Sequence, residues 1–191
     1  MAYGLILQKG QKWYTDLNFV FQSAGNVQTN YSWLITDWEC NQPVKELDCA
    51  SQILHETESR RYCWMSGDEL TEMIQKYKNL QFIWGAFSGF PKTISKEQAL
   101  SCPLPCADSD LFWKNPVFLQ HPLAELEIVP QDSSLVLFLA KERKLAEKFY
   151  RKCPASEDLW KYNTRHLIQD SVSFGTPCGK ISSLPADFDP N

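Results

Sequence analysis

Two glutamates stand two positions apart in the segment Ala-Glu-Leu-Glu-Ile-Val, residues 124–129. Because alternate side chains of a β-strand project from the same face, Glu125 and Glu127 would lie side by side, about 6.5 to 7 Å apart. Such a pair could serve as general acid and base or could bind a divalent cation. The alternation is also typical of a strand with one face in water, and we expect both glutamates to be hydrated, opposite the packed side.

Cysteine and histidine suggest a second chemistry, attack by a thiolate that an imidazole activates. A thiol that pairs in space with His121 cannot be recognised from the order of the residues. Cys102 and Cys106 have three residues between them, one more than the redox motif Cys-x-x-Cys. We therefore predict no catalytic residues, and we keep as the alternative a small enzyme that uses Glu125 and Glu127 or a Cys/His pair.

Signatures of metal and cofactor binding are missing as well. His55, Glu56 and Glu58 could each ligate a metal ion, but a zinc site needs three or four ligands and the remaining histidines are distant in the sequence. The chain contains no phosphate loop, no dinucleotide fingerprint and no His-Glu-x-x-His motif. We predict no metal site and no cofactor.

Charge and hydropathy indicate which partners, nucleic acid, membrane or protein, the chain is suited to bind. The net charge is -4, and the basic residues are concentrated between Lys141 and Lys152, which argues against nucleic acid as a partner and leaves only a local contact with an anion. No apolar run is long enough for a membrane span or a signal peptide. The seven cysteines are irregularly spaced, as in proteins whose thiols stay reduced. These features predict a cytoplasmic protein that is not bound to a membrane.

Tryptophan is the feature that points to a binding site. The chain has seven tryptophans, and three of them accompany acidic residues or lie on a neighbouring strand of the expected sheet. Tryptophan is favoured at the centre of protein interfaces, and an aromatic cluster beside carboxylates could bind a basic partner protein. We predict these binding residues: Trp33, Asp37, Trp38, Glu39 and Trp84. The alternative for any one tryptophan is that it simply fills the core.

One segment is expected to organise the fold. Residues 134–140 are apolar on both faces, which predicts an interior strand near the middle of the sheet, covered on both sides. A strand over 124–129 precedes it, with a turn over 130–133 where Pro130 cannot donate to a ladder. After it, the spacing of Leu145, Phe149 and Cys153 by four predicts a helix over 141–152.

The remaining elements complete an α+β prediction. Further strands are expected over 3–8, 31–38, 51–54, 61–65 and 80–87, the last broken by residues 88–91. Helices are expected from Trp13 to Ala24, after the capping box of Ser66 and Glu69, over 95–100, and for a turn or two after Ser156. Residues 39–50 read as a loop, and the proline-rich segment 92–122 reads as largely irregular.

The sequence thus predicts a single α+β domain over residues 1–168 and an extended or partly disordered C-terminal tail over 169–191. Its mostly antiparallel, mixed sheet should have about six or seven strands, with helices packed against it.

Three segments carry a resemblance to a known family. They are Tyr31–Ile35, Gln81–Pro91 and the hairpin from Glu125 to Leu139, and their hydrophobic patterns resemble a small bacterial family of uncharacterised proteins. The resemblance implies a soluble bacterial α+β protein and transfers no active site. Some small acidic bacterial proteins of this build are immunity proteins that block a toxin, so the resemblance suggests a non-enzymatic protein that binds another protein.

Overall fold

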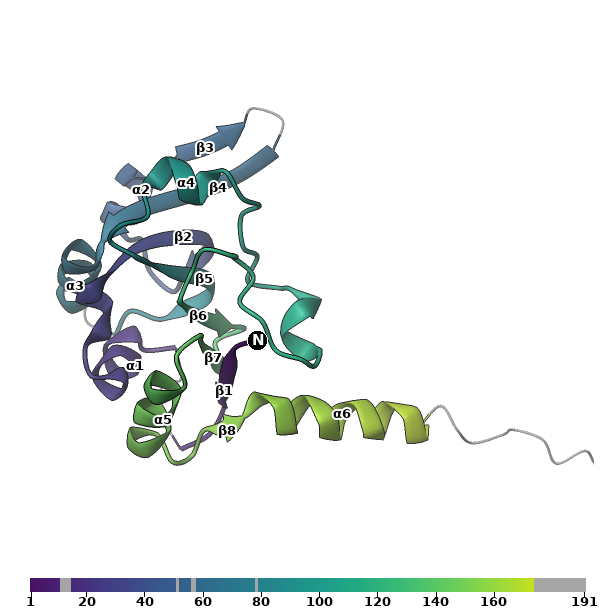
Figure 1. The fold of residues 1–191 in the computed structure, drawn as a ribbon. Coiled ribbons are helices and arrows are strands. Elements are labelled where there is room, and N and C mark those ends of the chain that lie inside the picture. Colours follow the sequence, from purple (N-terminus) through teal and green to yellow (C-terminus); the bar gives the residue numbers. More distant parts are fainter. Residues whose placement is uncertain (11–14, 51, 56–57, 78, 174–191) are drawn as a thin grey trace, which may run out of the picture.

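The computed structural model describes residues 1–10, 15–50, 52–55, 58–77 and 79–173 (Figure 1). Within these residues eight strands form one antiparallel sheet in the order β3-β4-β2-β5-β6-β7-β1-β8. The strands are β1 (Tyr3–Leu7), β2 (Tyr31–Cys40), β3 (Gln52–His55), β4 (Glu58–Ser66), β5 (Phe82–Pro91), β6 (Leu126–Gln131), β7 (Leu135–Ala140) and β8 (Glu157–Asp158). The predicted α+β class is confirmed, and the additional strand is the two-residue β8.

Three of the helices pack together on one side of the sheet. The helical elements are α1 (Leu17–Ala24), η1 (Val27–Asn30), α2 (Lys45–Ala50), α3 (Gly67–Lys76), α4 (Lys96–Leu100), η2 (Asp110–Trp113), α5 (Arg143–Lys152) and α6 (Leu159–Ser173). In Figure 1, α1, α3 and α5 lie to the left of the strands, and α6 extends away from the body to the right. The predicted capping box begins α3, where Ser66 Oγ accepts from the Glu69 amide and Glu69 accepts from the Ser66 amide.

The predicted interior strand is β7. It pairs with β6 on one side and β1 on the other, and residues Val136 to Ala140 are buried on both faces. Phe138 stacks on Phe149 of α5 with 4.3 Å between ring centroids, which fastens this helix to the sheet. The expectation of an interior strand covered on both faces is therefore confirmed, although β7 is the sixth of the eight strands rather than a central one.

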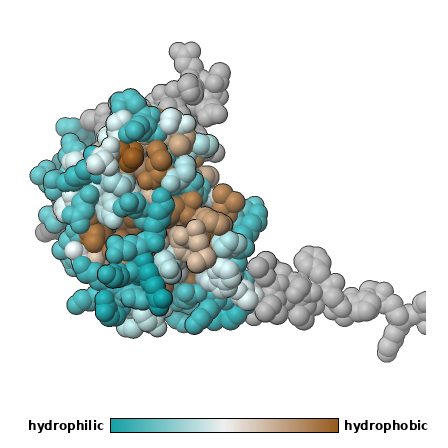
Figure 2. All heavy atoms as spheres, in the orientation of Figure 1, coloured by the Kyte–Doolittle hydropathy of each residue, from teal (hydrophilic) through white to brown (hydrophobic). Residues whose placement is uncertain are grey.

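The second face of the sheet is covered by the proline-rich segment. Residues of β6 and β7 that point away from the helices pack instead on Ala107, Phe112 and Val117. A further cluster joins Ala99 and Leu104 to β2 and β5. Although residues 92–122 contain little regular structure, as expected, they form a packed layer, and the sheet has a hydrophobic core on each side. Figure 2 shows hydrophobic side chains gathered in the middle of the face drawn in Figure 1, with hydrophilic ones around them.

Several predicted boundaries are wrong. β6 continues through Pro130 to Gln131, and the turn that follows is formed by Asp132 and Ser133, whose φ angles are 48° and 54°. β5 is not broken after residue 87, because Ser88 to Pro91 still pair with β2. The expected loop 39–50 contains helix α2, in which Leu47 is buried, and Val44, just before the helix, is buried too.

The C-terminal part also differs from expectation. Ser156 does not cap a helix; its hydroxyl donates to the Cys153 carbonyl at 2.6 Å, and the Lys161 amide instead donates to Asp158 at 2.9 Å. Helix α6 runs to Ser173, so residues 169–173 are helical where a tail was expected. The rest of the predicted tail, residues 174–191, lies outside the described residues, as do Trp13 and Glu56. Among the described helices, none combines the length and apolarity that crossing a bilayer requires.

Candidate functional site

A β-bulge in β2 creates the site. Pairing with β4 ends at Thr36, and the register with β5 shifts between Thr36 and Glu39. Asp37, at the bulge, has a φ of 55°, a left-handed conformation that aspartate tolerates better than most residues because its short side chain can bond locally. Asp37 is therefore exposed and leaves the face that it would share with Trp33 in a regular strand.

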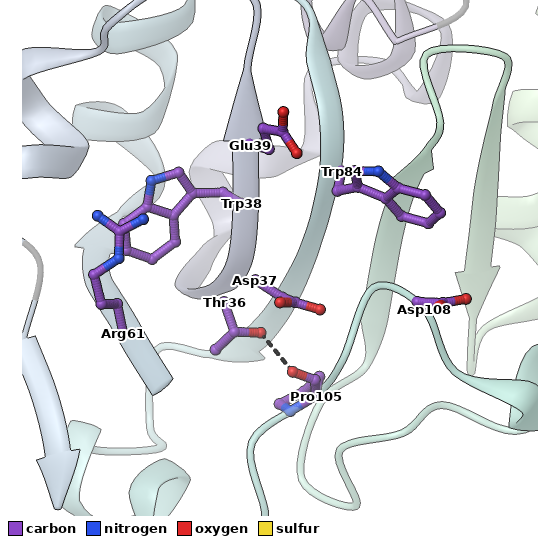
Figure 3. Close-up of a pocket in the computed structure, with 8 residues that line it drawn as sticks. All are labelled: Thr36, Asp37, Trp38, Glu39, Arg61, Trp84, Pro105 and Asp108. Atoms are coloured by element: carbon purple, nitrogen blue, oxygen red, sulfur yellow. Dashed lines mark hydrogen bonds between the residues drawn. The ribbon is translucent and has the colours of Figure 1, made fainter. Parts of the chain in front are cut away.

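The bulge opens a pocket of about 430 Å³. It is lined by Thr36, Asp37, Trp38, Glu39, Arg61, Trp84, Pro105 and Asp108 (Figure 3). Four of the five predicted binding residues are thus brought together: Asp37, Trp38, Glu39 and Trp84. Trp33 is not among them, because it is buried in the core on the helix side and its indole N–H donates to the Gln28 carbonyl at 2.9 Å.

Two tryptophans form walls of the pocket. In Figure 3, Trp38 and Arg61 lie together on one side of the pocket, and Trp84 lies on the opposite side. Asp37 lies between the two tryptophans. The guanidinium carbon of Arg61 lies 5.0 Å from the centre of the Trp38 ring, a cation–π contact. Trp84, on β5, pairs across the sheet with Glu39. The pocket therefore presents one indole that already carries a cation and a second, half-buried indole.

The proline-rich segment 92–122, which covers the second face of the sheet, is called the covering segment below. Hydrogen bonds hold it against the bulge. Thr36 Oγ donates to the Pro105 carbonyl at 2.8 Å. The Asp37 carboxylate accepts from the Ala107 amide at 2.9 Å and from the Cys106 thiol at 3.2 Å. These contacts place Asp108 at the pocket. The sequence prediction did not include four lining residues: Thr36, Arg61, Pro105 and Asp108. No local pattern indicates Pro105 and Asp108, because only the folded covering segment brings them to β2.

The pocket is electronegative. It is lined by the carboxylates of Asp37, Glu39 and Asp108 and by one guanidinium, that of Arg61. Within the described residues, Glu39 makes no hydrogen bond or ion pair through its side chain. Burial raises the pKa of the neighbouring Cys40 thiol to about 12, and the negative charges of Asp48 and Glu39 add to the effect. A cationic group with an apolar stem is the ligand that such carboxylates and indoles complement.

The alternative pair of glutamates is not assembled as expected. Glu125 is exposed, but Glu127 is only 1% exposed because the covering segment lies over this face of β6. Its carboxyl group accepts from the amides of Gln120 and His121, both at 2.8 Å, and from the Ser88 hydroxyl at 3.3 Å. The expectation that both glutamates are hydrated is wrong for Glu127, which anchors the covering segment to the sheet.

His121 is buried next to Glu127, and its ring is occupied by backbone groups. The Leu123 amide donates to Nδ1 at 3.2 Å, so Nε2 carries the proton and donates to the Ala99 carbonyl at 2.9 Å. Burial lowers the pKa of His121 and keeps the ring neutral. At the pocket, the Cys106 thiol donates to Asp37. The hydrogen bonds of these groups hold backbone segments and the bulge in place.

The described residues contain no group of three His, Cys, Asp or Glu side chains placed to hold a metal ion, and the predicted cluster at 55–58 lies partly outside them. Comparisons of the chain with protein-family models, with curated proteins and with solved structures find no match.

Proposed function

We propose that this protein is a non-catalytic binding protein that captures a basic side chain of a partner protein in the pocket at the β2 bulge. The observation that carries the proposal is the convergence of Trp38, Trp84 and three carboxylates on that pocket. The alternative enzyme loses support because Glu127 and His121 are engaged in holding the backbone.

The contact between Arg61 and Trp38 supports a cation as the ligand. It is an internal example of a guanidinium held on an indole of this pocket. An incoming lysine or arginine could place its methylene stem against Trp84 and its charge near Glu39 and Asp108. Indole rings that are partly exposed beside charged groups are typical of the anchor points of protein interfaces.

The kind of partner follows from charge. The chain has a net charge of -4, so a basic protein would be attracted to it over a distance as well as at the pocket. A toxin neutralised by an immunity protein is a partner of this kind, and the proposal includes that role. It also includes a cytoplasmic location, since Cys40, Cys63, Cys102, Cys106 and Cys153 are all thiols.

Isothermal titration with defined peptides tests the pocket. The probe is an acetylated Gly-Ser peptide with one central arginine, and the control replaces that arginine with citrulline, which has a similar shape and no charge. We expect the arginine peptide to bind with a dissociation constant on the order of 1 mM, more weakly at high salt, and the citrulline peptide not to bind. Equal binding of the two peptides would overturn the proposal.

Matched variants locate the interaction. Glu39→Gln should weaken binding of the arginine peptide by about fivefold, as the loss of roughly 1 kcal/mol implies. Glu125→Gln removes the same charge from an exposed glutamate outside the pocket and should leave the affinity unchanged. In host lysate, a basic protein that binds wild type and Glu125→Gln but not Glu39→Gln is the expected partner. An equal loss with both variants would mean that only overall charge matters.

A further inference from the structure

A second pocket adjoins the first. It has a volume of about 370 Å³ and is lined by Trp38, Glu39, Cys40, Asn41, Gln42, Pro43, Val44, Asp48 and Arg61. Three of these residues, Trp38, Glu39 and Arg61, also line the pocket at the bulge. The stacked Arg61 and Trp38 side chains therefore belong to the lining of both pockets, and we call this shared wall the ridge.

The rim of the second pocket is held in place by hydrogen bonds to the start of β5. Asn41 Oδ1 accepts from the Gln81 amide at 3.0 Å, and the Asn41 amide donates to the Gln81 carbonyl at 3.1 Å. The Asn41 side-chain amide also donates to the Asn79 carbonyl at 3.0 Å. A rim fixed by three such bonds is formed before any ligand arrives, which reduces the entropy cost of binding.

The second pocket has the same charge preference as the first. Glu39 belongs to both, and Asp48 of α2 adds a carboxylate to the second. Burial raises the pKa of the Cys40 thiol, which also lines this pocket, and the negative charges of Asp48 and Glu39 add to the effect. Each pocket thus combines at least one carboxylate with the Trp38 wall and suits one cationic side chain.

We propose that the ligand is an extended basic segment of the partner with two lysine or arginine side chains at positions i and i+2, one in each pocket. This inference rests on the proposed function. In an extended chain, side chains at i and i+2 project to the same side about 7 Å apart, which is enough to straddle a ridge one indole ring and one guanidinium wide. Adjacent basic residues would project to opposite sides and fill only one pocket.

Peptides with paired arginines test the spacing. Arg-Gly-Arg in the Gly-Ser background is compared with Arg-Gly-citrulline, with citrulline-Gly-Arg and with Arg-Arg. We expect Arg-Gly-Arg to bind about tenfold more tightly than either single-arginine peptide, because the second contact is intramolecular. Arg-Arg should gain no more than the twofold expected from having two alternative arginines.

One variant isolates the second pocket. Asp48→Asn should abolish the gain of Arg-Gly-Arg and weaken the binding of single-arginine peptides by no more than about twofold, because the first pocket stays intact. Asp132→Asn is the matched control, since Asp132 is an exposed aspartate in the β6–β7 turn and asparagine tolerates its φ of 48°. If single-arginine peptides bind but Arg-Gly-Arg shows no gain beyond twofold, this inference is overturned and the proposed function stands. If no single-arginine peptide binds, the proposed function fails as well.

Discussion

At the scale of single residues, Glu127 connects the core to the candidate site. Its carboxyl group holds the Gln120 amide, and the Gln120 side chain in turn bonds the Cys106 backbone at 2.7 Å and 3.1 Å. Cys106 then contacts Asp37 at the pocket. Burial raises the pKa of Glu127 to about 7, against the opposing effect of its hydrogen-bond donors. A buried carboxyl group therefore positions one wall of the pocket.

The pH dependence of stability should report this group. Because the pKa of Glu127 is about 7 in the folded protein and near 4.5 when unfolded, the folded state retains the proton that the unfolded state releases between these values. Glu127 therefore adds stability at low pH that is lost as the pH rises from about 4.5 to 7, by about 3 kcal/mol. Urea unfolding of wild type and Glu127→Gln across this range measures the loss as a difference.

The quantity to compare is the difference in the free energy of unfolding between wild type and Glu127→Gln. This difference is needed because His121 changes stability with pH in the opposite direction to Glu127. Its lowered pKa makes the folded state resist protonation, so its contribution to stability is lost as the pH falls. The amide of Glu127→Gln does not titrate, and it leaves one backbone amide without an acceptor, so the variant should be less stable at low pH and approach wild type as the pH rises. A difference that is independent of pH would contradict the assignment.

At the scale of elements, the bulge in β2 and the covering segment depend on each other. Asp37 supplies the acceptors for Ala107 and Cys106 at the position where the strand departs from regular geometry. Asp37→Ala removes these acceptors and leaves an alanine at a φ of 55°, so it should lower stability by about 2 kcal/mol. Amide hydrogen exchange should accelerate at Ala107 more than at Val129 of β6, and equal acceleration at both would argue against a local anchor.

Local patterns predicted many of the elements, because their signals are contained within a few residues. The capping box at Ser66 and the apolar run of β7 are examples. The burial of Glu127 could not be predicted, because the layer that covers it has no periodicity of its own. The alternation along β6 is real; it separates two cores rather than core from water.

The residues of the candidate site also fall into two groups: those that a local pattern predicts and those that only the folded chain brings together. Trp38 and Glu39 are consecutive with Asp37, so their association was evident from the sequence. Arg61 comes from a neighbouring strand, and Asp108 from the covering segment. Helix α2 was missed because it is short and polar. The apolar Val44 and Leu47 at a spacing of three, with the acidic Glu46 and Asp48 in the first turn, were a usable signal.

At the scale of the whole molecule, the two cores share their strands. Ile128 and Phe138 pack on the helix side, whereas Val129 and Leu137, their neighbours in sequence, pack on the other side. Neither core can be lost while the sheet remains intact, so we expect a single cooperative unfolding transition. Phe112→Ala, on the side of the covering segment, should destabilise the protein by about 3 to 5 kcal/mol.

Two probes check this cooperativity. Far-UV circular dichroism follows the strands and helices, and tryptophan fluorescence follows the packing around the indoles. The two transitions should coincide in wild type and move together in Phe112→Ala. A fluorescence change that precedes the loss of secondary structure would show that the covering segment detaches on its own.

The basic face of α5 lies across the sheet from the acidic pocket. This helix contacts β1 and β7, whereas the pocket is built on β2, β4 and β5. The separation of opposite charges gives the molecule an electric dipole. Under the proposed function, this dipole would orient the molecule so that its pocket faces an approaching cationic protein before the two make contact. Under the proposed function, neutralising the lysines of α5 makes the net charge more negative and removes repulsion, so a cationic partner should associate faster with little change in how long the complex persists, an effect that stopped-flow kinetics at low ionic strength would resolve.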